Sequence, residues 1–167
     1  PGVEHVAIEA HDWRGGVSIP ERVARELGYP CFVKPASLGS SVGITRVSEP
    51  KDLPDAVETA LAYGPRVIVE RGVSGREIEV GVLGNDELVV SPPGEIEYDA
   101  EWYDYETKYS PGLMRLSVPA DLDDETAAEA RALDRLIAAE AGADGTGPAG
   151  GPPASAVLAV ADEPPVA

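Results

Sequence analysis

The sequence predicts an α+β protein built as two small lobes around a cleft. From residue 21 to residue 69, the patterns alternate as helix, strand, Gly/Ser turn, strand, helix and strand, an order typical of a small α+β lobe. A glycine-bearing link at residues 70–77 then separates two further strand patterns. We interpret this link as a hinge to a second lobe.

Composition narrows the class of protein. The chain has 167 residues and a net charge of −17, which disfavours nucleic acid and anionic membrane surfaces as partners. Cys31 is the single cysteine, so neither an internal disulfide nor a Cys-based zinc site is available, and we expect it in a buried strand. No signal peptide or membrane-spanning run is recognisable, and we therefore expect a cytoplasmic protein.

The first lobe is defined by six segments. Residues 1–8 are expected to be half-buried extended chain. Ser18 and Glu21 form a capping-box pattern before a helix that Gly28 should end. The following segments are strand Cys31–Val33, strand Val42–Val47, a helix over residues 48–64, and a buried β-branched strand, Val67–Val69.

The most informative stretch begins at the end of strand Cys31–Val33. Lys34 is followed by a Gly/Ser turn in which glycine reaches positive φ, so that backbone N–H groups converge on an anion. Ser40 and Ser41 add hydroxyl donors, and Lys34 adds a charge suited to phosphate. No Gly-Lys-Ser/Thr follows, so this is not a P-loop. The residues alone leave open a phosphate-binding turn or an ordinary hairpin.

The second informative stretch is the hinge and the strand after it. Ile78, Val80 and Val82 should share one face of that strand, whereas Glu77 and Glu79 point to the other. Such glutamates belong either to the solvated face of a sheet or to a nucleotide site. In a nucleotide site, Glu77 would accept hydrogen bonds from ribose while the hinge backbone pairs with an adenine edge.

The third stretch, residues 102–112, holds four aromatic residues among alternating charges and ends in Pro-Gly. We expect a loop, either a lid over a ligand or a surface loop held by its own aromatics. A strand at Met114–Val118 and an Ala-rich helix at Asp121–Glu140 should follow. Residues 141–167 are rich in Ala, Gly and Pro and lack Lys, Arg and aromatic residues, so we expect a disordered tail.

Together these stretches resemble the D-alanine–D-alanine ligase family of the ATP-grasp fold. The matching segments are Val33-Lys34-Pro35 with Gly39-Ser40-Ser41-Val42-Gly43, the hinge from Val69-Glu70 to Glu77, and Tyr103-Asp104-Tyr105-Glu106-Thr107-Lys108-Tyr109. The resemblance implies two lobes around a nucleotide cleft, incomplete at both ends. Residues 1–70 would be the central subdomain, residues 71–140 part of the C-terminal subdomain, and residues 141–167 the tail.

The resemblance also implies an ATP site. Lys34 would contact the phosphates, Glu70 would accept from the adenine amino group, Glu77 would bind ribose, and Lys108 would reach the γ-phosphate. The backbone near two hinge residues would complete the adenine contact, and two serines would lie over the phosphates and the substrate. The full ATP-binding set is Lys34, Ser40, Ser41, Glu70, Arg71, Val73, Glu77 and Lys108.

Three of the matching residues would act in catalysis: Ser40, Lys108 and Tyr109. Tyr109 would close its loop over the second amino acid through a hydrogen bond to Ser40. Related ligases that use D-lactate carry histidine at this position, so Tyr109 favours a D-alanine acceptor. The implied reaction uses ATP and Mg²⁺ to join two D-alanines through an acylphosphate, as a step of peptidoglycan synthesis that supports cell wall and cell shape.

Parts of the family pattern have no match in this sequence. These are the domain that binds the first D-alanine and the segments that supply the magnesium ligands, so no metal ligand is assigned. We therefore expect the chain alone to be inactive. The resemblance also implies a homodimer, since family members form one. The alternatives are a D-alanine–D-lactate or D-alanine–D-serine ligase, and a non-catalytic nucleotide-binding fragment.

Overall fold

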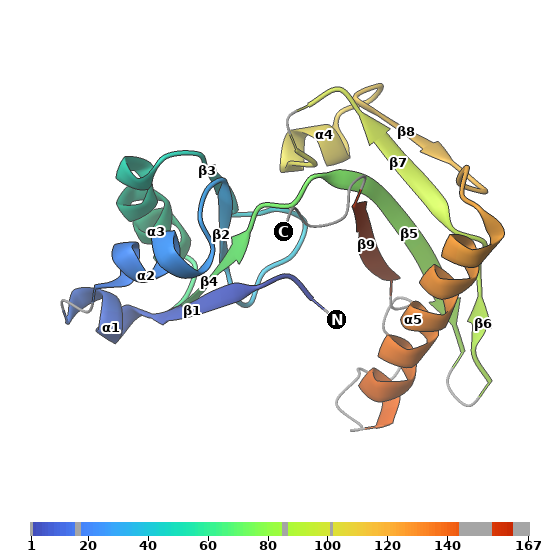
Figure 1. Ribbon diagram of the computed structural model, residues 1–167, viewed down its shortest axis with the longest axis horizontal. Coiled ribbons are helices and arrows are strands. Elements are labelled where there is room, and N and C mark those ends of the chain that lie inside the picture. Colours follow the sequence, from blue (N-terminus) through green and yellow to red (C-terminus); the bar gives the residue numbers. More distant parts are fainter. Residues whose placement is uncertain (1, 16–17, 85–86, 101, 144–154, 162–167) are drawn as a thin grey trace. The chain divides into compact units, whose positions relative to one another are not determined.

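The computed structural model describes residues 2–15, 18–84, 87–100, 102–143 and 155–161. The chain divides into two compact units (Figure 1). Unit 1 comprises residues 1–73 and 100–110, and unit 2 comprises residues 74–99 and 111–167. The sequence analysis placed residues 100–110 with the second lobe, whereas the contacts group them with the first.

Unit 1 is built on a four-stranded antiparallel sheet with strand order β1-β4-β2-β3. The strands are β1 (His5–Glu9), β2 (Cys31–Pro35), β3 (Thr45–Val47) and β4 (Arg66–Arg71). In β2 and β4, alternate residues are buried, as the pleat requires when only one face of a sheet packs on the core. Val33 in β2 lies opposite Val69 in β4.

Helices α2 (Ile19–Glu26) and α3 (Leu53–Leu61) cover the buried face of this sheet and contribute residues to the core. Helix α1 (Ala10–Arg14) follows β1, and the short 3-10 helix η1 (Pro50–Asp52) precedes α3. The expected helix over residues 48–64 is therefore shorter and opens with a 3-10 turn. Gly28 ends the α2 segment with φ of 71°, as predicted. The hydroxyl of Ser18, however, donates to the carboxylate of Glu21 and makes no bond to the helix backbone.

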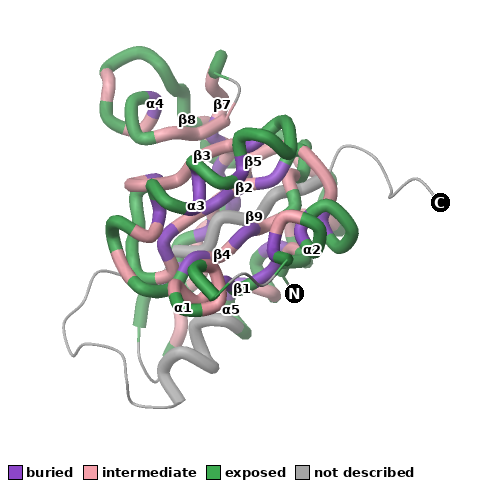
Figure 2. Tube along the Cα trace, turned by 90° about the vertical axis from the view of Figure 1, so that its left-hand side faces the viewer, coloured by how far each residue is buried: buried purple, intermediate pink, exposed green. Residues whose placement is uncertain are grey.

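The unit 1 core lies between this sheet and the helices, and its strands are among the buried segments of Figure 2. Side chains from all four strands and from the helices are almost completely enclosed there. The largest of them are Val6, Ile8, Val23, Val33, Val47, Leu53, Val57, Val67 and Val69. Cys31 is also buried, as expected, and burial raises the pKa of its thiol to about 11.

Unit 2 holds a five-stranded antiparallel sheet with the order β6-β5-β7-β8, and with β9 also paired to β5. The strands are β5 (Gly75–Leu83), β6 (Val89–Val90), β7 (Gly94–Tyr98), β8 (Met114–Ser117) and β9 (Ser155–Ala161). Ile78, Val80 and Val82 share the buried face of β5, as predicted. Helix α5 (Asp124–Ala143) contacts β5, β6 and β9.

Several segments differ from the expectations. The expected loop at residues 102–112 contains a helix, α4 (Tyr105–Tyr109), because Asp104 caps it by accepting from the Thr107 N–H at 2.8 Å. The second strand starts at Thr45 and not at Val42, because Gly43 has positive φ and the Val42 and Ile44 N–H groups donate within the turn, to the carbonyls of Gly39 and Ser41.

The expectation of a disordered tail over residues 141–167 is wrong for two of its parts, because residues 141–143 end helix α5 and residues 155–161 form β9. Residues 144–154 and 162–167 lie outside the described residues. Strand β7 and helix α1 were not predicted from the sequence. Within the described parts of the chain, no helix is both long enough and apolar enough to cross a membrane.

Candidate functional site

The face of the unit 1 sheet opposite the core carries a cation and an anion in contact. Lys34 in β2 and Glu70 in β4 alternate with buried residues and point to the same side. Lys34 Nζ lies 2.5 Å from a carboxylate oxygen of Glu70, and the two side chains are 30% and 25% exposed. Two of the predicted ATP-binding residues therefore form one half-buried ion pair.

An aromatic pair lies on the same face. Phe32 precedes Lys34 by two residues in β2 and lies opposite Glu70 in the β2–β4 register. Its ring meets that of Trp102 edge to face, with centroids 5.5 Å apart, a geometry that aromatic quadrupoles favour. The sequence analysis did not assign Phe32 or Trp102 to the site. The period of two in β2, which puts Phe32 beside Lys34, is the signal that could have found Phe32.

The Gly/Ser turn takes its unusual backbone from serines. Ser40 and Ser41 adopt φ of 53° and 59°, and among the neighbouring glycines Gly43 also has positive φ, at 72°. Glycine was expected to reach positive φ in this turn, and Gly43 does so, but the two serines adopt it as well. A left-handed conformation costs a non-glycine residue about 1–2 kcal/mol, so it persists where other contacts hold it.

Two hydrogen bonds provide those contacts, and both lead to the segment around α4. The Ser41 hydroxyl donates to the backbone carbonyl of Tyr103 at 3.0 Å. The Tyr109 hydroxyl donates to Ser40 Oγ at 2.8 Å, the contact that the family resemblance implies. Hydrogen bonds of two adjacent serines therefore connect the turn to both ends of the segment from residue 103 to residue 109.

Lys108 lies in helix α4, which is held in place by its N-terminal cap and by a buried threonine. Asp104 caps the helix, and hydrogen bonds from the Thr107 backbone and hydroxyl hold the pKa of Asp104 below its usual value. Thr107 is buried, whereas Tyr105 and Tyr109 are exposed and have ring centroids 4.7 Å apart. Lys108 Nζ lies 4.7 Å from the centroid of the Tyr103 ring.

The other predicted site residues are placed differently. The Arg71 side chain forms an ion pair with Glu4 at 2.5 Å and donates to the Glu26 carbonyl, while its backbone N–H donates to the Glu4 carbonyl. The Arg71 N–H is thus already engaged within unit 1. Val73 is 51% exposed. Glu77 belongs to unit 2, where it accepts a hydrogen bond from the Tyr98 hydroxyl at 3.2 Å.

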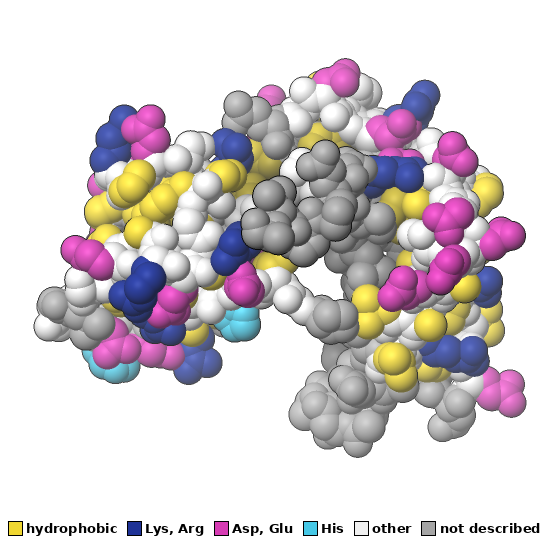
Figure 3. All heavy atoms as spheres, viewed as in Figure 1, with side chains coloured by type: hydrophobic (Ala, Val, Ile, Leu, Met, Phe, Trp, Pro, Cys, Tyr) yellow, Lys and Arg dark blue, Asp and Glu magenta, His cyan; other side chains and the backbone are white. Residues whose placement is uncertain are grey.

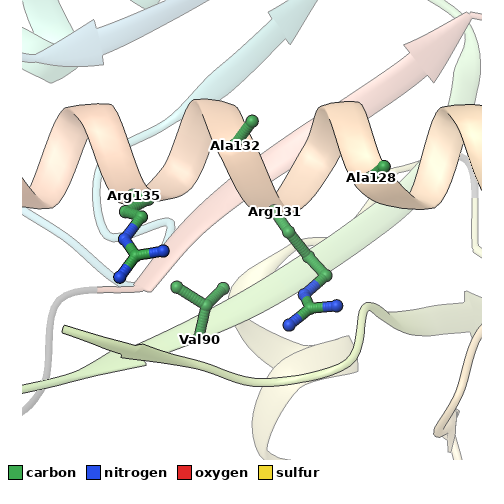
Figure 4. A pocket seen from close by; sticks show the side chains of 5 residues that line it. All are labelled: Val90, Ala128, Arg131, Ala132 and Arg135. Atoms are coloured by element: carbon green, nitrogen blue, oxygen red, sulfur yellow. The ribbon is translucent and has the colours of Figure 1, made fainter.

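Unit 2 also has a shallow depression of about 280 Å³ between α5 and β6. Arg131 and Arg135 extend from the same side of α5 toward Val90, and Ala128 and Ala132 complete its lining (Figure 4). None of the predicted site residues lines it.

On the face seen in Figure 3, Lys and Arg side chains are interspersed with acidic ones. Such a distribution does not favour a nucleic-acid surface.

The described residues do not bring together three His, Cys, Asp or Glu side chains in a way that could hold a metal ion. The groups in this part of unit 1 that could bind an anion are the ammonium groups of Lys34 and Lys108 and the hydroxyl groups of Ser40 and Ser41.

Comparisons with known proteins agree with the resemblance. A family model described as D-ala D-ala ligase C-terminus matches residues 1–147. The D-alanine–D-alanine ligase of Geobacillus thermodenitrificans (strain NG80-2) is 46% identical over 123 residues, which are 73% of this chain and 34% of the relative. That of Enterococcus faecalis (strain ATCC 700802 / V583) is 41% identical over 132 residues, 78% of this chain and 38% of the relative.

Solved structures give the same result. A D-Ala:D-Ser ligase from Enterococcus faecalis has a TM-score of 0.67 and 31% identity, covering 84% of this chain and 39% of that structure. The D-alanine–D-alanine ligase from Coxiella burnetii has a TM-score of 0.64 and 28% identity, covering 84% of this chain and 35% of that one. The chain spans about a third of the length of the curated relatives it matches. Its sequence and fold show that it belongs to the D-alanine–D-alanine ligase family, within the ATP-grasp fold.

Proposed function

We propose that this chain is the ATP-binding part of an ATP-dependent D-alanine–D-alanine ligase that makes a peptidoglycan precursor in the cytoplasm. The observation that carries the proposal is the set of contacts within unit 1. The Lys34–Glu70 ion pair, the Ser40–Tyr109 hydrogen bond and the Lys108–Tyr103 contact all belong to this unit. All but Tyr103 are residues that the family resemblance assigns to ATP or to catalysis.

Each residue has a role that fits its chemistry. Lys34 and Lys108 would bind ATP phosphates, since an ammonium group suits phosphate as a point charge. Glu70 would accept from the adenine amino group, and Phe32 and Trp102 offer apolar surface near it. Glu77 would bind the ribose hydroxyls. Arg71 and Val73 would contribute through backbone groups of the hinge, although the Arg71 N–H already donates to Glu4.

The proposed reaction has two steps. A carboxylate oxygen of the first D-alanine attacks the γ-phosphorus and the bond to the bridging oxygen breaks, giving an acylphosphate and ADP. The amine of the second D-alanine then attacks the acyl carbon, loses a proton, and phosphate leaves. Both steps build negative charge that fixed cations stabilise. Mg²⁺, when bound, would neutralise phosphate charge, and the Ser40–Tyr109 link would hold the turn closed over the second substrate.

The test is ATP binding by calorimetry, with and without magnesium. Lys34→Ala and Glu70→Ala should each weaken ATP binding about ten- to a hundredfold, because each removes a charge-assisted contact. Lys51→Ala is the matched control. Lys51 is an exposed lysine of η1 that pairs with Glu49, so ATP affinity should not change. Equal ATP affinity in all four proteins would refute the proposed site.

A D-alanine–D-serine ligase is the second candidate, because a D-Ala:D-Ser ligase is among the similar solved structures. The two functions differ in the acceptor and share the ATP site. A ligase chimaera in which these residues replace the matching segment of a relative would separate them. Competition among D-alanine, D-serine and D-lactate as acceptors should favour D-alanine if Tyr109 acts as proposed.

A further inference from the structure

We infer that Tyr103 is a positioning residue for Lys108: its ring holds the lysine ammonium group in place for the phosphates of ATP. The inference rests on the proposed function, because it assigns the ligand of Lys108 to ATP. Its observation is the 4.7 Å between Lys108 Nζ and the centroid of the Tyr103 ring. That distance lies within the range of about 6 Å over which a ring face attracts a cation.

The start of helix α4 places these two residues against each other. Asp104 is the N-cap, so Tyr103 occupies the position before the cap and Lys108 the fourth helical position. Side chains at these two positions meet in the hydrophobic staple that fixes the entry of a chain into a helix. Here the staple consists of an aromatic ring and a lysine. The Lys108 N–H donates to the Asp104 carbonyl at 3.0 Å and fixes the spacing.

The backbone of Tyr103 is itself bonded to the Gly/Ser turn. Its carbonyl accepts the hydrogen bond from Ser41, and its neighbour Trp102 packs on Phe32 of β2. The ring under Lys108 is therefore attached both to the turn and to the strand that carries Lys34. A change at Tyr103 should alter Lys108 without removing the Ser41 bond, because that bond uses the backbone.

The partner of Lys108 differs in kind from those of the other two lysines. Lys34 pairs with Glu70 and Lys51 pairs with Glu49, both of them carboxylates. A ring attracts the ammonium group through its quadrupole and carries no net charge. Among the described residues, Lys108 forms no ion pair with a carboxylate, so an arriving phosphate meets an ammonium group that the ring holds in place and does not neutralise. This arrangement suits a residue that has to bind the γ-phosphate.

The first arm of the test is NMR of the nucleotide-free protein. The chain has three lysines, Lys34, Lys51 and Lys108, so reductive ¹³C-methylation gives three dimethylammonium signals, and methylation keeps the charge. Lys→Arg variants assign them. The Lys108 signal should lie upfield of the Lys51 signal because of the Tyr103 ring current. Tyr103→Phe should keep that shift, and Tyr103→Leu should abolish it. Tyr105→Leu, in the same short helix, should leave it unchanged.

The second arm is ATP affinity of the unmethylated proteins. Tyr103→Leu should weaken ATP binding about two- to fivefold, the range expected for an exposed cation–π contact. Tyr103→Phe should restore it. A Lys108 signal that coincides with that of Lys51 in the wild type overturns the inference without any variant. So does unchanged ATP affinity in folded Tyr103→Leu.

The failure of the proposed function has a different signature. In that case the wild type would not bind ATP, yet the Lys108 signal would still respond to Tyr103. That result would leave the contact in place and overturn its assignment to ATP. The two arms therefore distinguish a missing contact from a missing nucleotide site.

Discussion

The two units differ in what holds their side chains in place. Unit 1 encloses a core of completely buried aliphatic residues, and it contains every lysine, both tryptophans and the single cysteine. Unit 2 has Tyr98 as its only aromatic residue, and several of its large apolar side chains are exposed: Leu83, Val89, Leu116, Val118 and Leu136. Both sheets carry cross-strand ion pairs: Lys34–Glu70 in unit 1, and in unit 2 Arg76–Glu95 between β5 and β7 and Arg115–Glu97 between β7 and β8.

The contrast indicates what fixes the positions of the candidate site residues. The Lys34–Glu70 pair and the turn at Ser40 lie on a sheet whose other face is packed, so a loss of packing there should also displace the site residues. The stability of unit 2 should depend more on charge and on pH. Four experiments test the contrast.

The largest effect is expected from Leu53→Ala in α3. Leu53 is completely buried in unit 1, so truncation leaves a cavity and should lower the free energy of unfolding by about 2–5 kcal/mol. Leu116→Ala in β8, where the side chain is 55% exposed, is the matched control and should change it by less than about 0.5 kcal/mol. Urea unfolding followed by tryptophan fluorescence reports unit 1, and circular dichroism reports both units. Similar losses for both variants would contradict the comparison.

A smaller effect is expected from Arg76→Ala in β5. Arg76 donates to both carboxylate oxygens of Glu95, at 2.7 and 2.6 Å, and to the Asp121 carbonyl. Because Glu95 is only 14% exposed, its loss of these bonds should cost about 1–3 kcal/mol. Arg115→Ala should cost less than about 1 kcal/mol, since that pair is exposed.

The Arg76–Glu95 pair also predicts a pH dependence. Hydrogen bonds from Arg76 hold the pKa of Glu95 below the ordinary 4.5. A lowered folded-state pKa stabilises the protein above pH 4.5, and this stabilisation disappears as the pH falls through the lowered pKa. Urea unfolding followed by circular dichroism between pH 3 and pH 6, a range that extends on the order of one pKa unit to either side of the ordinary value, should show this loss of stability. The slope should be shallower in Arg76→Ala, and an identical slope would count against the pair.

The smallest expected change is in the reactivity of Cys31. Because burial raises the pKa of this thiol to about 11, it should react with Ellman's reagent at neutral pH only when unit 1 opens. Leu53→Ala should accelerate the reaction. Arg76→Ala should leave its rate unchanged, because Arg76 lies in unit 2. Acceleration by Arg76→Ala would show that the two units open together.

Local patterns in the chain were sufficient to predict much of the fold. The β-branched run Val67–Val69 and the alternation from Ile78 to Val82 locate β4 and β5, since a strand buried on one or both faces needs those side chains. Helix α4 was missed because its five residues are too few for a helical period to appear, and only the Asp104 cap marks it. Strand β9 lies in an Ala- and Gly-rich segment with no strong strand pattern, and its pairing with β5 arises from a distant part of the chain.

For the candidate site, the sequence by itself determined which residue types are present and in what order. Lys34 after a buried strand, Ser40 and Ser41 in the turn, and Lys108 and Tyr109 before Pro-Gly can all be found without coordinates. Only the tertiary structure decided which of them touch. Ser40 meets Tyr109 and Lys34 meets Glu70 across separations of 69 and 36 residues, and such contacts depend on strand register and on packing, which no local pattern encodes.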